Sequence, residues 1–377
     1  MAGLIVRPRA GILHGHDWVY GNEVLKIFGE PQDGDVISIK DGRDRLLGTA
    51  IYNSKSKIVA RRISHRRQDL DPDFFRRRIA MAAEVRDRAG CRRDLRRVVW
   101  SESDGLPGVI ADQYGDTAVL QTLTLAMDNH KAEIAAALIE TLGVRGVIER
   151  NDATVRAAEG MESASGILLG EPTPVQPIRI DDVTFEIDLL AGQKTGFYLD
   201  QVANYAAVAK HATGRRVLDC FSNQGGFALA CAKAGAVSVV AVESGLESFE
   251  RLQANAARNN LDVRCERADV AEYLRRAERT GEKFDLIILD PPSFTKSRGK
   301  LHDAMRGYRD LHVRAGALLG PGGLLATFSC SHHVDIVTFL DTVCGGLSDA
   351  RRSARLIAEY RQAPDHPIVL HLPETFY

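Results

Sequence analysis

Cysteine is scarce in this sequence, and neither sign of charge is in excess. The six cysteines among 377 residues are Cys91, Cys220, Cys231, Cys265, Cys330 and Cys344. They lack the close pairing of metal ligands, so we expect reduced thiols, most of them buried, and no metal site. A net charge of −1 at pH 7 excludes a protein that is basic over its whole surface.

Long hydrophobic runs are missing as well. The longest, such as Leu286–Leu289, fall far short of the roughly 20 residues that a membrane-spanning helix requires. The first ten residues include Arg7 and Arg9 and carry no apolar segment of signal-peptide length. We therefore expect a cytoplasmic protein with no membrane partner.

Arginine, by contrast, is concentrated in one region. Thirteen arginines lie between Arg61 and Arg97, against six acidic residues. Such a cluster indicates either a surface that binds a phosphate backbone or a solvated helix face with local ion pairs. The residues alone favour neither interpretation.

The first 65 residues alternate short apolar stretches with glycine and aspartate turns, which predicts a small antiparallel barrel. Within them, His14–Tyr20 and Asp33–Val36 resemble the opening of a PUA domain, an RNA-binding pseudo-barrel. We interpret Trp18 and Tyr20 as core anchors rather than as platforms on which bases stack.

A small α/β unit follows the barrel. Its predicted elements are an arginine-rich helical connector and then strands and one helix, at 72–97, 109–111, 118–122, 130–142 and 146–149. Arg150, Asp152 and Arg156 come just after the last strand. We favour ion pairs with Glu149 and Glu159 over RNA contacts for these residues.

The length of the chain predicts two or three domains of about 150 residues each. Three prolines, Pro172, Pro174 and Pro177, mark a boundary before the last of them. We divide the chain into a PUA domain over 1–68, a central α/β domain with its basic connector over 69–178, and a Rossmann-like domain over 179–377.

The stretch Val217–Glu243 predicts a cofactor site, because a strand, a tight loop, a helix and a second strand follow one another there. A dinucleotide-binding loop would contain three spaced glycines, but only the adjacent Gly225 and Gly226 are present. Asp219 would repel phosphate and suits the ammonium and sulfonium groups of S-adenosylmethionine. Glu243 stands where an acidic residue accepts hydrogen bonds from ribose hydroxyls.

Strands and helices continue to alternate beyond Glu243, which predicts a doubly wound parallel sheet. Asp269 either accepts a hydrogen bond from an adenine amino group or caps the next helix. The glycine-bearing turn Gln193–Gln201 precedes the first strand and either covers the cofactor or begins a helix capped by Thr195.

Two later strands are followed by polar groups that a core would not select. They are Asp290–Phe294, which begins Asp-Pro-Pro, and Ser329–His333, which contains Cys330. Both lie at carboxyl ends of strands, where such sheets bind ligands. Methyltransferases that act on exocyclic amines usually carry an aromatic residue directly after the second proline, whereas Ser293 stands there in this chain.

Cys330 and Asp290 instead fit methylation at carbon 5 of a pyrimidine. That carbon is a feeble nucleophile, and a thiolate that adds to carbon 6 activates it. Cys330 would supply the thiolate, and Asp290 would hold N3 by hydrogen bonding, as its proton donor if its pKa is raised in the closed site. A base must afterwards remove the proton from carbon 5, and His332 and His333 are the nearby candidates.

At this point the chain closely resembles, over nearly its whole length, the PUA-containing RNA cytosine-5 methyltransferases that modify large-subunit ribosomal RNA. The motifs that carry the resemblance are Gly15–Tyr20, Ser101–Gly108, Glu149–Asp152, Asp188–Phe197, Cys220–Ser222, Gly225–Phe227, Asp290–Phe294, Phe328–His333 and Pro364–Pro367.

The resemblance implies an α/β protein with a PUA β-barrel, a small central α/β domain and a Rossmann-like class I methyltransferase domain, with Cys330 as nucleophile. It implies cofactor contacts from the methyltransferase domain at Asp219, Phe221, Ser222, Gly225, Glu243, Asp269 and Asp290, and from a closing segment at Lys194, Thr195, Phe197 and Gln201.

Two positions, Val202 and Ser293, can be compared with the family pattern. Val202 replaces an arginine that usually follows Asp-Gln, which removes one polar contact near the cofactor or RNA. Ser293 occupies the position of the second cysteine in two-cysteine RNA enzymes, so product release must use another base. A related branch that modifies guanine lacks the cysteine at position 330, which favours cytosine here.

We therefore expect an S-adenosylmethionine-dependent enzyme that flips a cytosine out of RNA, in particular large-subunit ribosomal RNA, and methylates carbon 5. RNA is the expected partner, and a homodimer is left open. One alternative is the same fold acting on another base atom or another RNA. The other is a non-catalytic RNA-binding or ribosome assembly factor.

Overall fold

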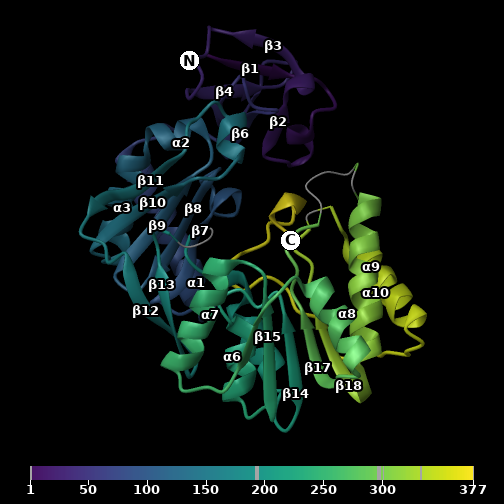
Figure 1. Ribbon diagram of the computed structural model, residues 1–377. Helices are drawn as coiled ribbons and strands as arrows, with labels where there is room; N and C mark the ends of the chain where they lie inside the picture. Colours follow the sequence, from purple (N-terminus) through teal and green to yellow (C-terminus); the bar gives the residue numbers. More distant parts are fainter. Residues whose placement is uncertain (1, 192–194, 295–298, 300, 332, 377) are drawn as a thin grey trace. The chain divides into compact units, whose positions relative to one another are not determined.

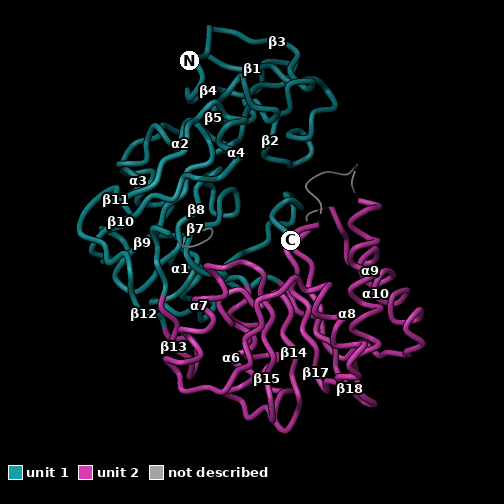
Figure 2. Tube along the Cα trace, viewed as in Figure 1, with its two compact units in different colours: residues 1–178, 187–200, 362–376 teal, residues 179–186, 201–361, 377 magenta. Residues whose placement is uncertain are grey.

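The computed structural model describes residues 2–191, 195–294, 299, 301–331 and 333–376. They form two compact units (Figure 2). Unit 1 comprises residues 1–178, 187–200 and 362–376, and unit 2 comprises residues 179–186, 201–361 and 377. The first two predicted domains thus lie in one unit, which also takes in the C-terminal segment. The three-domain division stays a prediction.

The N-terminal part of unit 1 is a six-stranded sheet in the order β2-β6-β5-β4-β1-β3. Its elements are β1 (Gly3–Val6), η1 (Gly11–His14), β2 (Trp18–Tyr20), η2 (Gly21–Glu23), β3 (Val24–Phe28), β4 (Val36–Lys40), β5 (Leu46–Tyr52) and β6 (Ile58–Ser64). The purely antiparallel prediction was wrong in one respect, because β1 pairs with β4 in parallel. Turn residues identify hairpins between consecutive strands, and this pair is not consecutive.

The second part of unit 1 is a five-stranded sheet in the order β11-β10-β9-β8-β7. Its elements are α1 (Pro72–Arg88), β7 (Leu95–Trp100), η3 (Ser101–Asp104), β8 (Val109–Tyr114), β9 (Thr117–Thr122), α2 (Leu125–Asn129), α3 (Lys131–Leu142), β10 (Gly146–Asn151), α4 (Val155–Ala158) and β11 (Ala164–Gly170). Helix α1 begins where the Asp71 carboxylate accepts from the Phe74 N–H, with Pro72 in the first turn. Its buried Phe75 and Ile79 share a core with β7 and β9.

The arginine cluster is largely paired inside the protein. Ten of its thirteen members form an ion pair with a carboxylate: Arg61, Arg62, Arg76, Arg77, Arg86, Arg88, Arg92, Arg93, Arg96 and Arg97. Most of the cluster is therefore accounted for by local structure, and it gives little independent support for a phosphate-binding surface.

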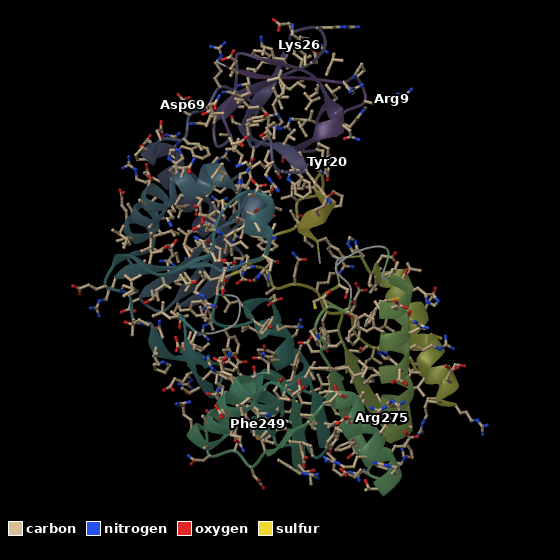
Figure 3. The ribbon with its side chains drawn as sticks, turned by 45° about the horizontal axis from the view of Figure 1, so that its top comes forward. Arg9, Tyr20, Lys26, Asp69, Phe249 and Arg275 are labelled. Atoms are coloured by element: carbon tan, nitrogen blue, oxygen red, sulfur yellow. The ribbon has the colours of Figure 1, made fainter. Side chains whose placement is uncertain are left out.

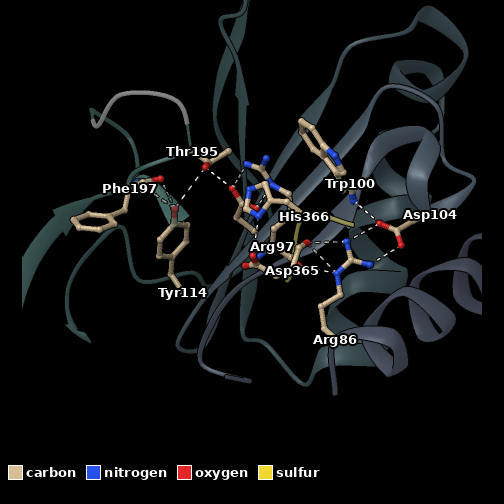
Figure 4. A network of polar contacts seen from close by, with 10 residues as sticks. Arg86, Arg97, Trp100, Asp104, Tyr114, Thr195, Phe197, Asp365 and His366 are labelled. Atoms are coloured by element: carbon tan, nitrogen blue, oxygen red, sulfur yellow. Dashed lines mark hydrogen bonds and ion pairs between the residues drawn. The ribbon is translucent and has the colours of Figure 1, made fainter. Parts of the chain in front are cut away.

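A buried network joins the C-terminal segment to this sheet (Figure 4). Arg86 is completely buried and pairs with Asp104, and its guanidinium also donates to the backbone oxygen of Asp365 at 2.9 Å. The Asp365 carboxylate accepts from the Arg97 N–H at 2.8 Å. Each buried charge thus has a partner, as the cost of removing it from water requires.

Residues of the motif His14–Tyr20 also contact the C-terminal segment. His16 lies 3.3 Å from Glu374, and Asp17 lies 2.8 Å from His371. The Trp18 indole N–H donates to Glu102 at 2.9 Å and is half-buried, whereas Tyr20 is 38% exposed (Figure 3). The prediction of Tyr20 as a core anchor was wrong, because its side chain points to solvent from the end of a short strand.

Ion pairs also explain the charged residues at the end of β10 and just after it, though with other partners than predicted. Arg150 pairs with Asp152 at 3.0 Å, and Arg156 pairs with Asp128 at 2.9 Å. Both arginines are buried, so the structural interpretation holds. The partner of Arg156 lies 28 residues away, and sequence proximity favoured Glu159 instead.

A two-stranded sheet of β12 (Val175–Ile180) and β13 (Val183–Asp188) precedes the main sheet of unit 2. That sheet contains β14 (Arg216–Cys220), β15 (Ser238–Glu243), β16 (Arg264–Arg267), β17 (Phe284–Leu289) and β18 (Leu319–Thr327). All its pairs are parallel, in the order β16-β15-β14-β17-β18 (Figure 1). This is the predicted doubly wound arrangement.

The other elements that follow in the chain are η4 (Leu199–Gln201), α5 (Val202–Ala209), α6 (Gly226–Lys233), α7 (Leu246–Arg258), α8 (Val270–Thr280), α9 (Leu301–Leu318), α10 (Ile336–Asp349) and η6 (Pro373–Thr375). Helices α8 and α9 share one buried cluster with the sheet, in which Leu274 and Leu311 accompany Leu218 and Ile287. Burial of this kind stabilises the fold by roughly 1.5–3 kcal/mol for each large apolar side chain.

The cysteines form no disulfide among the described residues, and only Cys220 and Cys231 are buried. The expectation that most would be buried was therefore wrong, since Cys330 and Cys344 are exposed. In the described ranges we find no helix with the length and apolar character needed to cross a membrane.

The Arg86–Asp104 pair makes a quantitative prediction. Asp104→Asn leaves the Arg86 charge uncompensated in a site where the two side chains are 0% and 4% exposed, so we expect a loss of about 3 kcal/mol in the free energy of unfolding. Urea unfolding measures it. The matched control is Asp73→Asn, whose carboxylate is 62% exposed beside Arg76 and Arg77, and which should cost less than about 1 kcal/mol. Equal losses would contradict a buried charge network.

Candidate active site

The candidate site lies at the edge of the unit 2 sheet where all five parallel strands end. The order of the strands reverses between β14 and β17, and sheets of this kind bind ligands at such a point. The groups predicted from the sequence follow these strands: Asp219 to Gly225 at β14, Glu243 at β15, Asp269 after β16, Asp290 after β17 and Cys330 after β18. The structure thus brings the unit 2 candidates to one edge.

The loop after β14 has an unusual backbone. Phe221 and Asn223 both have positive φ, of 65° and 49°, although neither is glycine. Such conformations cost about 1–3 kcal/mol each and tend to persist at functional sites. Hydrogen bonds hold them here: the Ser222 hydroxyl donates to the Asp219 carbonyl at 2.8 Å, and the Asn223 N–H donates to Glu243 at 2.9 Å.

The two glycines of this loop have a packing role. Gly225 has φ of 95°, and a β-carbon there would lie 2.7 Å from Leu252. A β-carbon on Gly226 would lie 2.3 Å from the Tyr205 ring. Glycine at both positions is therefore required by the close approach of the loop to α5 and α7, in addition to any role beside a cofactor.

Asp219 carries the clearest electrostatic signal. Its side chain is 1% exposed, and Oδ2 accepts from the Ala228 N–H at 3.0 Å. Oδ1 is buried with no hydrogen-bond partner in the described part of the chain. Burial raises the pKa of Asp219 to about 8. A cation bound at this carboxylate would satisfy the unpaired oxygen, so the residue fits the positively charged end of S-adenosylmethionine.

Glu243 and Asp269 both have structural partners. Besides Asn223, the Glu243 carboxylate accepts from the Gly245 N–H at 2.7 Å, so it orients the loop. Each carboxylate oxygen has a further lone pair that a ribose hydroxyl can use. Asp269 caps α8 by accepting from the Glu272 N–H at 3.0 Å. The capping interpretation of Asp269 is thus confirmed, and its contact with adenine stays a prediction.

Two side-chain amides, of Gln201 and Asn204, are linked by hydrogen bonds to the Asp290 carboxylate. The Gln201 side-chain N–H donates to Asp290 Oδ2 at 3.3 Å, and the Asn204 amide donates to Gln201 Oε1 at 2.6 Å. Asn204 therefore orients Gln201, which in turn binds Asp290. The sequence pointed to Gln201 and missed Asn204, which lies one helical turn later and belongs to no motif.

Cys330 lies against the Asp-Pro-Pro turn. Residue Leu289 pairs with Thr327 across β17 and β18, and the Phe328 N–H donates to the Leu289 carbonyl at 2.9 Å. This register brings the loops that follow β17 and β18 close to each other. The Cys330 thiol lies 3.7 Å from the Pro291 carbonyl oxygen. The thiol is exposed, as a nucleophile for a macromolecular substrate must be.

The rest of the predicted closing segment belongs to unit 1. The Thr195 hydroxyl donates to Asp112, and the Phe197 N–H donates to the Tyr114 hydroxyl at 3.1 Å (Figure 4). A helix capped by Thr195 was a wrong interpretation, because α5 begins only at Val202. Lys194 and His332 lie outside the described residues.

Tyr308 is a buried residue of α9 that the sequence did not point to, and its hydroxyl lies beside both neighbours of Cys330. Its apolar neighbours Ala304 and Leu311 repeat at helical spacing, which marks a core face and not a site. His333 is exposed. Among the described side chains, no group of three or more histidines, cysteines or carboxylates is placed to hold a metal ion.

Comparison with known proteins gives a consistent assignment. A family model of S-adenosylmethionine-dependent methyltransferases matches residues 120–356, and a model of PUA-like domains matches residues 7–65. Ribosomal RNA large subunit methyltransferase I of Erwinia tasmaniensis is 37% identical over 373 residues, which cover 97% of this chain and 94% of that protein. The protein of the same name from Aeromonas salmonicida is 38% identical over 382 residues, covering 99% and 96%.

Solved structures share the fold over the whole chain. A protein of Streptococcus mutans assigned to the SAM-dependent methyltransferases superposes with a TM-score of 0.85 at 22% identity, covering 100% of this chain and 98% of that one. A second protein assigned as a methyltransferase, solved in complex with SAH, has a TM-score of 0.86, 22% identity and the same coverage. These likenesses confirm the fold class, and none of the comparisons supports a homodimer.

The raised pKa of Asp219 predicts how cofactor affinity depends on pH. At pH 6–7 this carboxyl is protonated in the free protein, and a cation binds its ionised form, so binding must release a proton. The dissociation constant for S-adenosylmethionine should fall by up to about tenfold per pH unit between pH 6 and 8 and level off above. Calorimetric titrations at several pH values measure it.

The free energy of unfolding of the free protein should decrease as the pH rises, whereas the affinity for the cofactor increases. Because the folded pKa is raised, the stability that Asp219 contributes to the free protein is present below about pH 4 and is lost as the pH rises through 8. Asp219→Asn should weaken cofactor binding and remove its pH dependence while stabilising the free protein at pH 8–9. The control is Asp285→Asn, whose pKa of about 2 lies outside this range. A pH profile shared by wild type and Asp219→Asn would contradict the role of Asp219.

Proposed function

The chain belongs to the family of S-adenosylmethionine-dependent methyltransferases, and from this premise we propose that it methylates carbon 5 of a cytosine in large-subunit ribosomal RNA. The observation that carries the proposal is the exposed Cys330 thiol at the end of β18, 3.7 Å from the carbonyl oxygen of the residue after Asp290. A thiol against the turn that begins with Asp290, at the ligand-binding edge of this sheet, suits covalent activation of a pyrimidine.

The choice of RNA is supported by the relatives and by the N-terminal domain. Two relatives that cover nearly the whole chain are named for the large ribosomal subunit RNA. A PUA-like domain matches residues 7–65, and its six-stranded sheet encloses a core of buried residues such as Val19 and Ile37. The arginine cluster adds little to this argument, because most of its charges are paired within the protein.

Cys330 activates the cytosine by a covalent bond that forms and later breaks. Its thiolate adds to carbon 6 of the flipped cytosine and forms a sulfur–carbon bond, which makes carbon 5 electron-rich. S-adenosylmethionine, when bound, would supply the methyl group to carbon 5, and S-adenosylhomocysteine would be the leaving group. A base then takes the proton from carbon 5, the sulfur–carbon bond breaks with its electron pair returning to Cys330, and the 5,6 double bond is restored.

Asp290 and Gln201 orient the base in this proposal. Asp290 in its protonated form donates a hydrogen bond to N3 of the cytosine, and the Gln201 amide holds the carboxyl group by donating to Oδ2. The chain positions this pair before substrate arrives, because Asn204 holds Gln201 in turn. The base that removes the proton from carbon 5 is unassigned, and Ser293 at the position of a second cysteine cannot serve as a thiolate.

Asp219 would hold the cationic end of the cofactor and Glu243 its ribose. The same assignment extends to further contacts at Phe221, Ser222, Gly225, Asp269 and Asp290, which follow β14, β16 and β17 at the same edge of the sheet. Proposed contacts at Lys194, Thr195, Phe197 and Gln201 rest on the family resemblance, and only the last of these lies in unit 2.

The proposal predicts a 5-methylcytosine that depends on one thiol. Purified protein is incubated with S-adenosylmethionine and with large-subunit RNA, free and as ribosomal particles, from cells that lack the corresponding gene. Mass mapping of the RNA locates the methyl group. Cys330→Ala should lower the rate by about 1,000-fold or more, because the covalent route is lost. Cys344→Ala removes another exposed thiol and should leave the rate unchanged.

The possible outcomes separate the alternatives. Equal methylation by wild type and Cys330→Ala would contradict the thiol mechanism and move the reaction to another atom. A methylated base other than cytosine would contradict the specificity. Tight cofactor binding with no methylation of either substrate would favour a binding or assembly role.

A further inference from the structure

A chain of four hydroxyl groups runs from the interior of unit 2 to the loop that carries Cys330. The Tyr308 hydroxyl lies 3.0 Å from the Ser329 hydroxyl and 3.1 Å from the Ser331 hydroxyl. The Ser331 hydroxyl lies 3.2 Å from that of Ser293 in the Asp-Pro-Pro-Ser turn. The two serines bonded to Tyr308 are the immediate neighbours of Cys330, one on each side.

A hydrogen bond within the loop also links the two serines that flank Cys330. The Ser331 N–H donates to the Ser329 hydroxyl oxygen at 3.3 Å, so the serines are linked across Cys330. Ser331 is 4% exposed, whereas the cysteine between them is exposed. The residues on both sides of Cys330 are therefore held by hydrogen bonds, while Cys330 itself is exposed.

Tyr308 is rigidly held at the other end of the chain. Its side chain is completely buried, and its ring contacts Phe294 and Phe339 with centroid distances of 4.7 and 5.5 Å. One turn later on α9, the buried His312 bonds the Tyr308 carbonyl oxygen and, at 2.8 Å, the Thr327 hydroxyl at the end of β18. Helix α9 thus contacts the Cys330 strand at two successive turns.

The arrangement suits positioning rather than proton transfer. A hydroxyl has one proton to donate, so Tyr308 can donate to one serine while it accepts from the other. Burial raises the pKa of Tyr308, and its phenol stays protonated at working pH. Nothing in this chain removes a proton, but it restricts where the thiol can lie.

We propose that Tyr308 is a positioning residue for the nucleophile, acting through Ser329 and Ser331 to place the Cys330 thiol for attack on carbon 6. Through Ser331 and Ser293 the same hydroxyls tie the Cys330 loop to the turn that begins with Asp290. This inference rests on the proposed function of Cys330. A nucleophile that must reach one carbon of a flipped base gains from such restriction, since a misplacement of about 1 Å can cost about 100-fold in rate.

The test is Tyr308→Phe, which keeps the ring contacts and removes only the hydroxyl. We expect kcat to fall by about 10- to 100-fold, with KM for RNA and Kd for S-adenosylmethionine within about twofold of wild type. The matched control is Tyr273→Phe on α8, another tyrosine with a buried ring, whose hydroxyl bonds Glu282 at 3.3 Å. The control loses one buried tyrosine hydroxyl as well and should keep the kcat of wild type.

A second measurement follows the covalent step itself. RNA with 5-fluorocytosine at the target carries fluorine in place of the proton on carbon 5, so the adduct with Cys330 cannot release and accumulates. Tyr308→Phe should form this adduct more slowly by the same factor as its loss in kcat, and Tyr273→Phe at the rate of wild type. Ser329→Ala and Ser331→Ala, which cut the chain at its other members, should each slow it too.

The outcomes distinguish this inference from the function on which it rests. Full methylation by Cys330→Ala would overturn the proposed mechanism itself. Loss of methylation in Cys330→Ala, together with a kcat and adduct rate for Tyr308→Phe equal to those of Tyr273→Phe, would overturn the role of Tyr308 alone. If Tyr308→Phe does not fold, the two serine variants provide the test instead. Adduct formation at the rate of wild type in both Ser329→Ala and Ser331→Ala would overturn the role of Tyr308.

Discussion

The parallel pairing of β14 with β17 is the constraint on which the candidate site depends. It sets Cys220 opposite Leu289, so the loops that follow the two strands begin at the same edge of the sheet, at the point where strand order reverses. Asp219 near the end of one strand and Asp290 after the other are brought to that edge. A shift of one residue in this register would turn either side chain to the opposite face.

The site concentrates features that oppose folding. A buried carboxyl with a raised pKa adjoins a loop in which Phe221 and Asn223 adopt left-handed conformations. Hydrogen bonds from the Ser222 hydroxyl and to Glu243 hold this loop, and the apolar cluster between the sheet and helices α8 and α9 supplies the compensating stability. A bound cation at Asp219 would remove part of the electrostatic cost, which couples cofactor binding to the stability of this unit.

Compensation of buried charge also accounts for the buried arginines of unit 1. Arg86 and Arg97 are buried only because Asp104, Asp112 and the C-terminal segment neutralise or bond them. Motifs that resemble an RNA-binding domain, including the barrel motif at Trp18, are engaged in the same internal contacts. Residues shared with a family can thus serve the architecture of the protein as much as its substrate, and their roles follow from their partners.

Local sequence patterns were enough to identify the alternation of strands and helices, the loop after β14, and the Asp290 and Cys330 motifs. Periodicity, turn residues and strand ends are local properties, so a linear pattern suffices to identify them. The partners of the arginines, the Asp112 contact of Thr195 and the place of Tyr308 beside the neighbours of Cys330 became evident from the folded chain alone. These contacts join residues far apart in the chain, as in the 279 residues between Arg86 and Asp365, and no local pattern encodes which distant group completes a buried hydrogen bond.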